Sequence, residues 1–318
     1  MRNRVILLAL ASAIFMNIEP GVLFGQEPQT GHGNPEPPMA GVHWAKGEKP
    51  DSPGNSANAP GQRGKPGGSA NMSYHGGTIM VTTAVTPIFW GPRWSDPSFV
   101  ADKMTGLATL YSDLNNSTFA DTSNEYYQTG LVYRQVTSAI TSSTAMVDLS
   151  PAVKNGNRTS LILSEVCKMI TSPIANGYYP VYVDTRRGNA GFCAWHSAGS
   201  CGGVLVQFAF FFDLDGDVGC DPGNKVSQNS QGLAALANVS AHEISEARTD
   251  PHLDAWYDAS GEENADKCAW TFGSDYVTLN NHSQWTLQGN WSNLAYNAGT
   301  GYANSKSQKG CLDGGNFK

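Results

Sequence analysis

The hydrophobic and polar positions along the chain predict alternating strands and helices. Three stretches are apolar and rich in β-branched or aromatic side chains, which is typical of buried strands; they cover residues 78–90, 178–184 and 203–212. Three others are predicted to be helices; they cover residues 96–114, 159–170 and 231–249. After residue 268 the abundance of Trp, Asn and Gly predicts hairpins and loops. We therefore expect an α/β or α+β domain with a layered sheet flanked by helices.

The first residues indicate export. Arg2 and Arg4 precede an apolar run over residues 5–15, which is the pattern of a secretory signal peptide, and a cut near Gly25 is expected. The run is shorter than the roughly 20 apolar residues that span a bilayer, and no later stretch is long and apolar enough. We predict a signal peptide over residues 1–25 and a secreted protein, extracellular or periplasmic, without a membrane span.

Composition divides the remainder into two parts. Residues 26–73 are dominated by Pro, Gly, Asn and Ser and show no apolar periodicity. Such a segment buries too little apolar surface to offset its ordering entropy, so we predict a flexible tether. Residues 74–318 are then expected to form a single globular domain.

Charge and cysteine content exclude some classes of protein. The chain has 20 Lys and Arg against 27 Asp and Glu, a net charge of −7, which excludes a basic nucleic-acid-binding protein. Its 6 cysteines all follow the predicted signal peptide. An even number in an exported chain predicts disulfides, although the spacing leaves their pairing open. No Cys-x-x-Cys pair is present, so a thiolate zinc knuckle is not expected.

The predicted helix over residues 231–249 carries the most informative motif, His242-Glu243-x-x-Glu246. Residues four apart lie one turn apart on the same face, so His242 and Glu246 can bind one metal ion together, as in the zincin motif His-Glu-x-x-His. Zinc accepts carboxylate as well as imidazole ligands. Glu243 would act as the general base on a zinc-activated water. The alternative is that these polar side chains simply face water or pair with neighbours.

A third metal ligand has to come from elsewhere in the chain. Glu263 lies 17 residues after Glu246, similar to the separation in thermolysin-type proteases, and Asp266 follows closely. His252 lies 10 residues after His242, as in metzincins, but Thr249 replaces the glycine of that family. Asp250 is a further candidate. The alternative role of these carboxylates is capping and turn formation.

Other candidate residues lie outside this segment. His196 is predicted to lie in a disulfide-pinned loop, as a ligand, as a catalytic residue that stabilises an oxyanion, or as a structural histidine. His75 is predicted to be structural. Asp213, Asp215 and Asp217 resemble a calcium loop, but the glycine is misplaced for an EF-hand, and a solvated acidic turn is the alternative.

Several of these features together resemble the EXORDIUM/phosphate-induced protein family, secreted plant proteins with many bacterial relatives. The matching elements include the motifs Tyr74-His-Gly-Gly77, Cys193-x-x-His196, His242-Glu-Ile-Ser-Glu-Ala247 and Glu263-x-x-Asp266-x-Cys268. The resemblance implies an extracellular protein, linked in plants to cell-wall growth, and it implies a Cys268–Cys311 bridge. It carries no established catalytic activity.

Two functions are consistent with these features. The first is a secreted zinc-dependent hydrolase that acts on extracellular polypeptide as a metallopeptidase, with zinc bound by His242, Glu246 and Glu263 or Asp266. The second is a non-catalytic EXORDIUM-like protein that binds cell-wall polysaccharide through aromatic platforms such as Trp285 and Trp291. Core packing is the alternative role of those tryptophans.

Overall fold

A mixed sheet lies at the centre of the computed structural model, which describes residues 36–50, 70–130 and 132–318. Its main path runs β1-β10-β11-β9-β3-β7, and β4 continues from β9 to β8. β1, β10 and β11 pair antiparallel, whereas β9 pairs parallel with β11, β3 and β4. The strands are β1 (Ala40–Trp44), β3 (Thr83–Val85), β4 (Ile88–Trp90), β7 (Ile140–Ser142), β8 (Met146–Asp148), β9 (Gly177–Arg186), β10 (Phe192–Cys201) and β11 (Val204–Asp213). The predicted α/β architecture with a layered sheet is confirmed.

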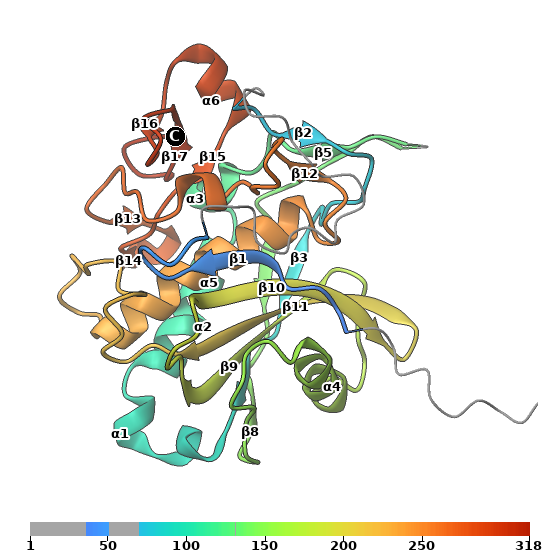
Figure 1. Cartoon of the computed structure of the whole chain (residues 1–318), viewed down its shortest axis with the longest axis vertical. Helices are drawn as coiled ribbons and strands as arrows, with labels where there is room; N and C mark the ends of the chain where they lie inside the picture. Colours follow the sequence, from blue (N-terminus) through green and yellow to red (C-terminus); the bar gives the residue numbers. More distant parts are fainter. Residues whose placement is uncertain (1–35, 51–69, 131) are drawn as a thin grey trace, which may run out of the picture. The chain divides into compact units, whose positions relative to one another are not determined.

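Helices cover both sides of this sheet (Figure 1). Successive side chains of a strand point to opposite faces. On one face, Tyr182 of β9 contacts Ser240 of α5 through hydroxyls 2.7 Å apart. On the other, the Trp195 indole of β10 donates to Gly156 O, just before α4, over 2.8 Å. The helices are α1 (Pro97–Val100), α2 (Lys103–Leu114), α3 (Thr118–Asp121), α4 (Thr159–Met169), α5 (Gln231–Thr249) and α6 (Asn293–Ala298).

Two predicted elements are interrupted for local reasons. The strand expected over residues 78–90 is divided into β3 and β4, and Pro87, which has no N–H to donate to a ladder, lies between them. The helix expected over residues 96–114 is divided into α1 and α2, because Ala101 has a φ of 45°. The helix predicted over residues 231–249 is confirmed as α5.

The prediction of a flexible tether is wrong for residues 36–50. Ala40–Trp44 forms β1, an edge strand that pairs with β10. His43 is completely buried and shares a 3.0 Å hydrogen bond with the Gln288 side chain. A short Ala-Gly-Val-His-Trp segment is therefore part of the core, although the composition around it is dominated by Pro and Gly. The predicted signal peptide and residues 26–35 and 51–69 lie outside the described residues.

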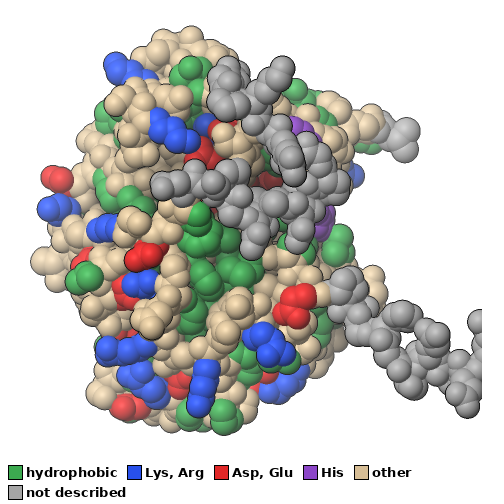
Figure 2. Space-filling view, viewed as in Figure 1, with side chains coloured by type: hydrophobic (Ala, Val, Ile, Leu, Met, Phe, Trp, Pro, Cys, Tyr) green, Lys and Arg blue, Asp and Glu red, His purple; other side chains and the backbone are tan. Residues whose placement is uncertain are grey.

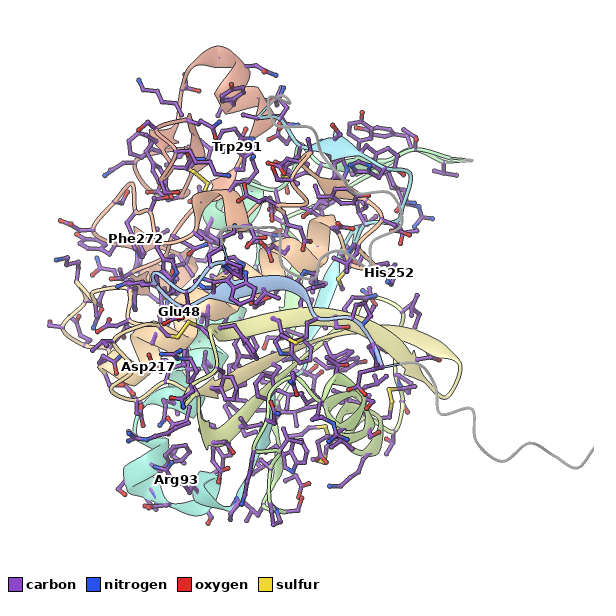
Figure 3. All side chains as sticks on the ribbon, in the orientation of Figure 1. Glu48, Arg93, Asp217, His252, Phe272 and Trp291 are labelled. Carbon is purple, nitrogen blue, oxygen red and sulfur yellow. A yellow bond between two sulfur atoms is a disulfide. The ribbon has the colours of Figure 1, made fainter. Side chains whose placement is uncertain are left out.

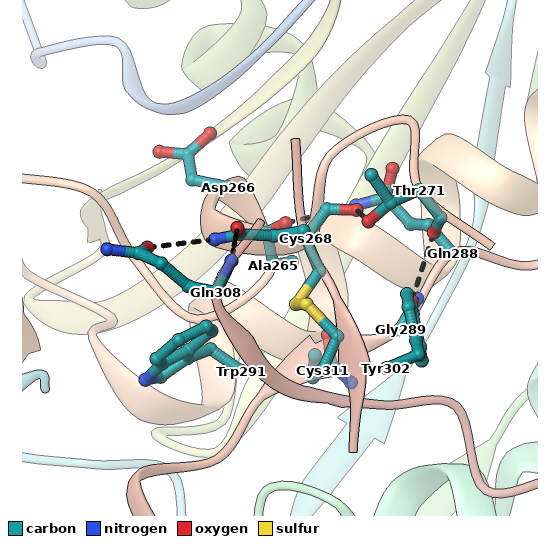
Figure 4. The surroundings of a disulfide bond; sticks show 12 residues. Ala265, Asp266, Cys268, Thr271, Gln288, Gly289, Trp291, Tyr302, Gln308 and Cys311 are labelled. Carbon is teal, nitrogen blue, oxygen red and sulfur yellow. Dashed lines mark hydrogen bonds between the residues drawn. A yellow bond between two sulfur atoms is a disulfide. The ribbon is translucent and has the colours of Figure 1, made fainter. Parts of the chain in front are cut away.

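The C-terminal part consists of short antiparallel pairs, as predicted, and it holds one of three disulfides. The bridges are Cys167–Cys201, Cys193–Cys220 and Cys268–Cys311. The last confirms the bridge that the family resemblance implied, and Figure 4 shows Asp266 and Gln288 beside it. The strands outside the central sheet are β2 (Ser73–Tyr74), β5 (Tyr127–Gln128), β6 (Arg134–Gln135), β12 (Trp256–Tyr257), β13 (Val277–Thr278), β14 (Gln284–Trp285), β15 (Asn290–Trp291), β16 (Tyr302–Ala303) and β17 (Lys309–Leu312).

The surface matches the low charge content. On the face shown in Figure 2, Lys and Arg side chains lie among Asp and Glu side chains rather than in a single basic patch. Within the described ranges, no helix is both long and apolar enough to cross a bilayer.

Candidate metal centre

Helix α5 positions the predicted motif inside the protein. Ser230 caps its N-terminus, where the hydroxyl accepts a 3.1 Å hydrogen bond from the Leu233 N–H. The helix ends at Thr249, just before Asp250 and Pro251. Because the sheet covers one side and the C-terminal part the other, every α5 residue after Gln231 is buried. The motif is therefore an interior one, and its side chains do not face water.

Two groups of potential metal ligands converge on Glu246. One consists of His196, Glu246 and Glu263, and the other of His242, Glu243 and Glu246. In each group one ligand atom from every residue lies within 4.8 Å of the others. All five side chains are at most 2% exposed. By distance alone, either group could hold a metal ion.

The distances define how the groups are arranged. His196 Nε2 lies 3.3 Å from Glu263 Oε2 and 3.8 Å from Glu246 Oε2. His242 Nε2 lies 3.1 Å from Glu246 Oε1. The predicted set of His242, Glu246 and Glu263 is thus divided between two groups that share Glu246.

His196 reaches the site from an unexpected element. It lies within β10 and not in a loop, opposite Ala40 of β1 and Ala209 of β11. The Cys193–Cys220 bridge does hold the beginning of this strand. Alternation along β10 places the imidazole on the face that α5 covers. A strand buried on both faces explains why His196 is completely buried.

Glu263 comes from the loop after β12, which α5 holds in place. The Asp266 N–H donates to Glu246 Oε1 over 2.8 Å. The Asp266 carboxylate itself lies 3.9 Å from His242 Nε2 and belongs to neither ligand group. Of the two predicted alternatives for the third metal ligand, Glu263 is therefore better positioned than Asp266.

Several polar atoms of the site are buried without a hydrogen-bond partner. They are His242 Nε2, both carboxylate oxygens of Glu243, Glu246 Oε2 and Glu263 Oε1. Leaving such groups unpaired costs about 1–3 kcal/mol each, and more when the group is charged. A divalent cation would satisfy the carboxylate oxygens and compensate their charge, so the donor set fits a metal.

Burial also controls the protonation of the site. It raises the pKa of Glu246 to about 8 and raises the pKa of Glu243 and Glu263 well above the usual range. It lowers the pKa of His196 to about 3 and that of His242 to about 4. Both histidines are therefore neutral at pH 7, the form in which imidazole binds metal ions. A bound cation would favour the ionised carboxylates, so metal and protons compete for this site.

The structure does not bring His252 or Asp250 into either ligand group. His252 lies in the loop beyond α5 (Figure 3). Asp250 Oδ1 instead accepts two 2.8 Å hydrogen bonds, from the N–H groups of Asp254 and Ala255. Asp250 therefore has the turn-forming role that the sequence offered as an alternative. His75 stacks on Tyr257 with ring centroids 3.6 Å apart, which fits the structural role predicted for it.

The acidic turn after β11 is not arranged as a calcium site. Asp213 lies 3.1 Å from Arg93 Nη1, Asp215 pairs with Lys103, and Asp217 lies 2.7 Å from Arg187 Nε. Arg93 and Asp217 are labelled in Figure 3. Each carboxylate thus has a basic partner, and the three do not form a ligand group. Lys and Arg side chains therefore pair with the carboxylates that the calcium prediction assigned to a metal ion.

Sequence reasoning missed two residues beside the site. Gln288 and His43 contact His242 directly: Gln288 Nε2 lies 2.8 Å from His242 Nδ1, and the two imidazole rings have centroids 4.1 Å apart. Gln288 lies in the Trp- and Asn-rich C-terminal part, and His43 lies in the segment predicted to be a tether. Neither carries a local pattern that would mark it.

Comparison with known proteins adds no relative. No protein-family model, curated protein or solved structure matches the chain.

Proposed function

We propose that this protein is a secreted zinc-dependent hydrolase of the metallopeptidase type. The observation that carries the proposal is the pair of buried His/Glu groups that share Glu246 and leave carboxylate oxygens unpaired. Imidazole and carboxylate are the ligands of catalytic zinc sites, which use three protein ligands and an open position. The three disulfides suit an oxidising extracellular compartment.

Within this hydrolase the side chains have distinct tasks. Zinc would supply Lewis acidity and lower the pKa of water. Glu246 holds the metal, because it belongs to both ligand groups. Glu243 is the general base, because both of its carboxylate oxygens are buried beside Glu246 without a hydrogen-bond partner. A buried site also excludes water that would weaken these electrostatic interactions.

Access to the site requires β1 to move. A methyl group on Gly41 would lie 2.1 Å from Glu246 Oε2 and 2.4 Å from His196 Nε2, so the β1 backbone lies directly against the ligands. β1 is an edge strand with β10 as its neighbour. In the hydrolase, an extended polypeptide would replace β1 along β10, because strand addition to a sheet edge uses the same backbone hydrogen bonds.

The burial of the site favours a second function, an extracellular protein whose metal is structural. Structural zinc sites are closed, whereas catalytic sites keep an open position, and every ligand here is at most 2% exposed. We propose membership of the EXORDIUM/phosphate-induced family, which carries no established catalytic activity, together with this alternative. The sugar-binding platforms are not supported, because Trp285 and Trp291 are only 3% and 0% exposed.

One set of measurements separates the two functions. Zinc content, peptide hydrolysis and the melting temperature are measured for the wild type and for Glu246→Ala and Glu243→Gln. For a hydrolase, the wild type carries stoichiometric zinc and cleaves an unstructured peptide; Glu246→Ala loses both, and Glu243→Gln keeps zinc but loses cleavage.

For a structural metal, the wild type carries zinc without cleaving peptides, and chelation lowers its melting temperature. Glu243→Gln then behaves like the wild type in every measurement. If neither zinc nor another divalent ion binds to the wild type, both functions are excluded.

A further inference from the structure

We infer that the metal binds His196, Glu246 and Glu263, and that His242 is not a ligand but an N–H donor whose tautomer Gln288 sets. This inference rests on the proposed metal centre and deepens it. It exchanges the roles that the sequence suggested for the two histidines.

The side-chain amide of Gln288 has four hydrogen-bonding partners. Its Oε1 lies 3.2 Å from the Trp270 N and 3.0 Å from His43 Nε2. Its Nε2 lies 3.1 Å from Ala265 O and 2.8 Å from His242 Nδ1. The amide is buried, so these contacts account for its whole hydrogen-bonding capacity.

The two backbone partners determine which way the amide points. A backbone N–H can only donate, so the Trp270 N–H must meet the amide oxygen. A backbone carbonyl can only accept, so Ala265 O must meet the amide NH₂. If the amide were turned around, its NH₂ would face the Trp270 N–H and its oxygen would face Ala265 O. Each group left unsatisfied in this buried site would cost about 1–3 kcal/mol.

The orientation of Gln288 sets the tautomer of His242. Because Gln288 Nε2 donates, His242 Nδ1 must accept and carries no proton. The proton of the neutral ring is then on Nε2, which faces the site 3.1 Å from Glu246 Oε1. A nitrogen that carries a proton cannot bind a metal, and metal-bound histidines normally donate from their other nitrogen. Gln288 therefore keeps His242 from acting as a ligand.

His196 has no such restraint. Its Nδ1 is buried without a hydrogen-bond partner, so no neighbouring donor requires that nitrogen to act as an acceptor. With the proton on Nδ1, the Nε2 lone pair faces Glu263 Oε2 at 3.3 Å and Glu246 Oε2 at 3.8 Å. Of the two histidines, His196 is the one free to present a lone pair to a cation.

The two oxygens of Glu246 are divided in the same way. Oε1 accepts from the Asp266 N–H over 2.8 Å and faces the His242 Nε2–H. Oε2 has no hydrogen-bond partner and faces His196. Glu246 therefore binds the metal through Oε2, in the group that contains His196 and Glu263. The His242 Nε2–H faces Glu246 Oε1 and the Gly41 backbone of β1, so a substrate that replaces β1 would receive this N–H on one of its oxygens.

The tautomers are tested on the wild type, where folding is not in question. Long-range ¹H–¹⁵N correlations of the 7 histidines distinguish Nδ1–H from Nε2–H rings, and single-histidine variants assign the signals. We expect an Nε2–H tautomer for His242 with and without zinc, and direct zinc coordination at His196 Nε2. An Nδ1–H signal for His242 in the zinc-loaded protein would overturn the inference.

Zinc content provides the matched comparison. His196→Ala and His242→Ala each remove one buried imidazole, and circular dichroism verifies that each variant folds. We expect His196→Ala to lose the zinc equivalent, and His242→Ala to keep it with an affinity lowered by about 10- to 100-fold, the usual effect of a residue next to a ligand. Loss of zinc from both variants, or from His242→Ala alone, contradicts the inference. If the wild type binds no zinc, the proposed function fails, while the metal-free spectrum still tests the tautomer set by Gln288.

Discussion

His196 Nε2 and Glu263 Oε2 lie 3.3 Å apart, although 67 positions separate the two residues in the chain. One belongs to a central strand and the other to a loop after β12. Neither is more than 2% exposed. A buried imidazole and a buried carboxylate at this distance, with Glu246 beside them, form the part of the site to which we assign the metal.

Replacing Glu263 by glutamine should stabilise the metal-free protein and abolish its affinity for zinc. Burial raises the pKa of Glu263 well above its usual range, so the carboxyl group is unfavourable in the absence of metal. A neutral amide of the same shape relieves this cost by about 1–3 kcal/mol. Melting curves in chelator and in zinc measure both effects. An unchanged zinc-induced rise in melting temperature would exclude Glu263 as a ligand.

Asp250 should make stability fall as pH rises. Burial raises its pKa to about 8, against about 4 in the unfolded chain. Between these values the folded protein binds one more proton than the unfolded chain, so the free energy of unfolding decreases with increasing pH. The advantage of Asp250→Asn over the wild type should therefore grow from pH 5 to pH 8, by at most about 1.4 kcal/mol per pH unit.

Glu262→Gln provides the control for this pH dependence. Burial opposes the ionisation of Glu262, but Lys49 and Lys306 outweigh it and lower its pKa to about 2. Its contribution to stability is complete above the unfolded pKa of about 4.3 and is lost only as pH falls toward 2. The difference between Glu262→Gln and the wild type should thus be constant from pH 5 to pH 8. Chemical denaturation at each pH measures both variants.

The backbone of Gly41 should be essential to the metal centre. Its φ is +44°, and a methyl group there would lie 2.1 Å from Glu246 Oε2. Gly41→Ala therefore has to displace β1 or Glu246, and we expect reduced zinc content together with a loss of stability of about 1–3 kcal/mol. Gly47→Ala is the matched control, because Gly47 also has a positive φ, +78°, but no atom lies within 4 Å of the added methyl. Equal zinc content in the two variants would show that β1 does not touch the metal centre.

The Cys268–Cys311 bridge should stabilise both the fold and the site. It joins residues 43 positions apart and lies two residues after Asp266. Replacing both cysteines by alanine should cost about 2–4 kcal/mol and loosen the Glu263–Asp266 segment, which would lower zinc affinity. The matching Cys167→Ala, Cys201→Ala variant removes a bridge between α4 and β10, on the sheet face away from α5. It should lose stability but keep its zinc affinity, as measured by melting curves and chelator competition.

The sequence alone determined the main elements and one part of the site. The helical spacing of His242 and Glu246 placed them on one face of α5, because residues one turn apart are neighbours in any helix. The apolar runs at residues 178–184 and 203–212 predicted β9 and β11, since strands covered on both faces are almost continuously apolar.

Only the tertiary structure decided which residues complete the site. The strand pairing brings His196 beneath α5, and β1 comes from a Pro- and Gly-rich region whose composition hides a buried strand. The contact of Gln288 with His242 joins residues 46 positions apart. No local period records such contacts, because they depend on how strands and loops pack rather than on the spacing of residues along the chain. The tautomer of His242, and with it the division of labour between the two histidines, follows from that packing.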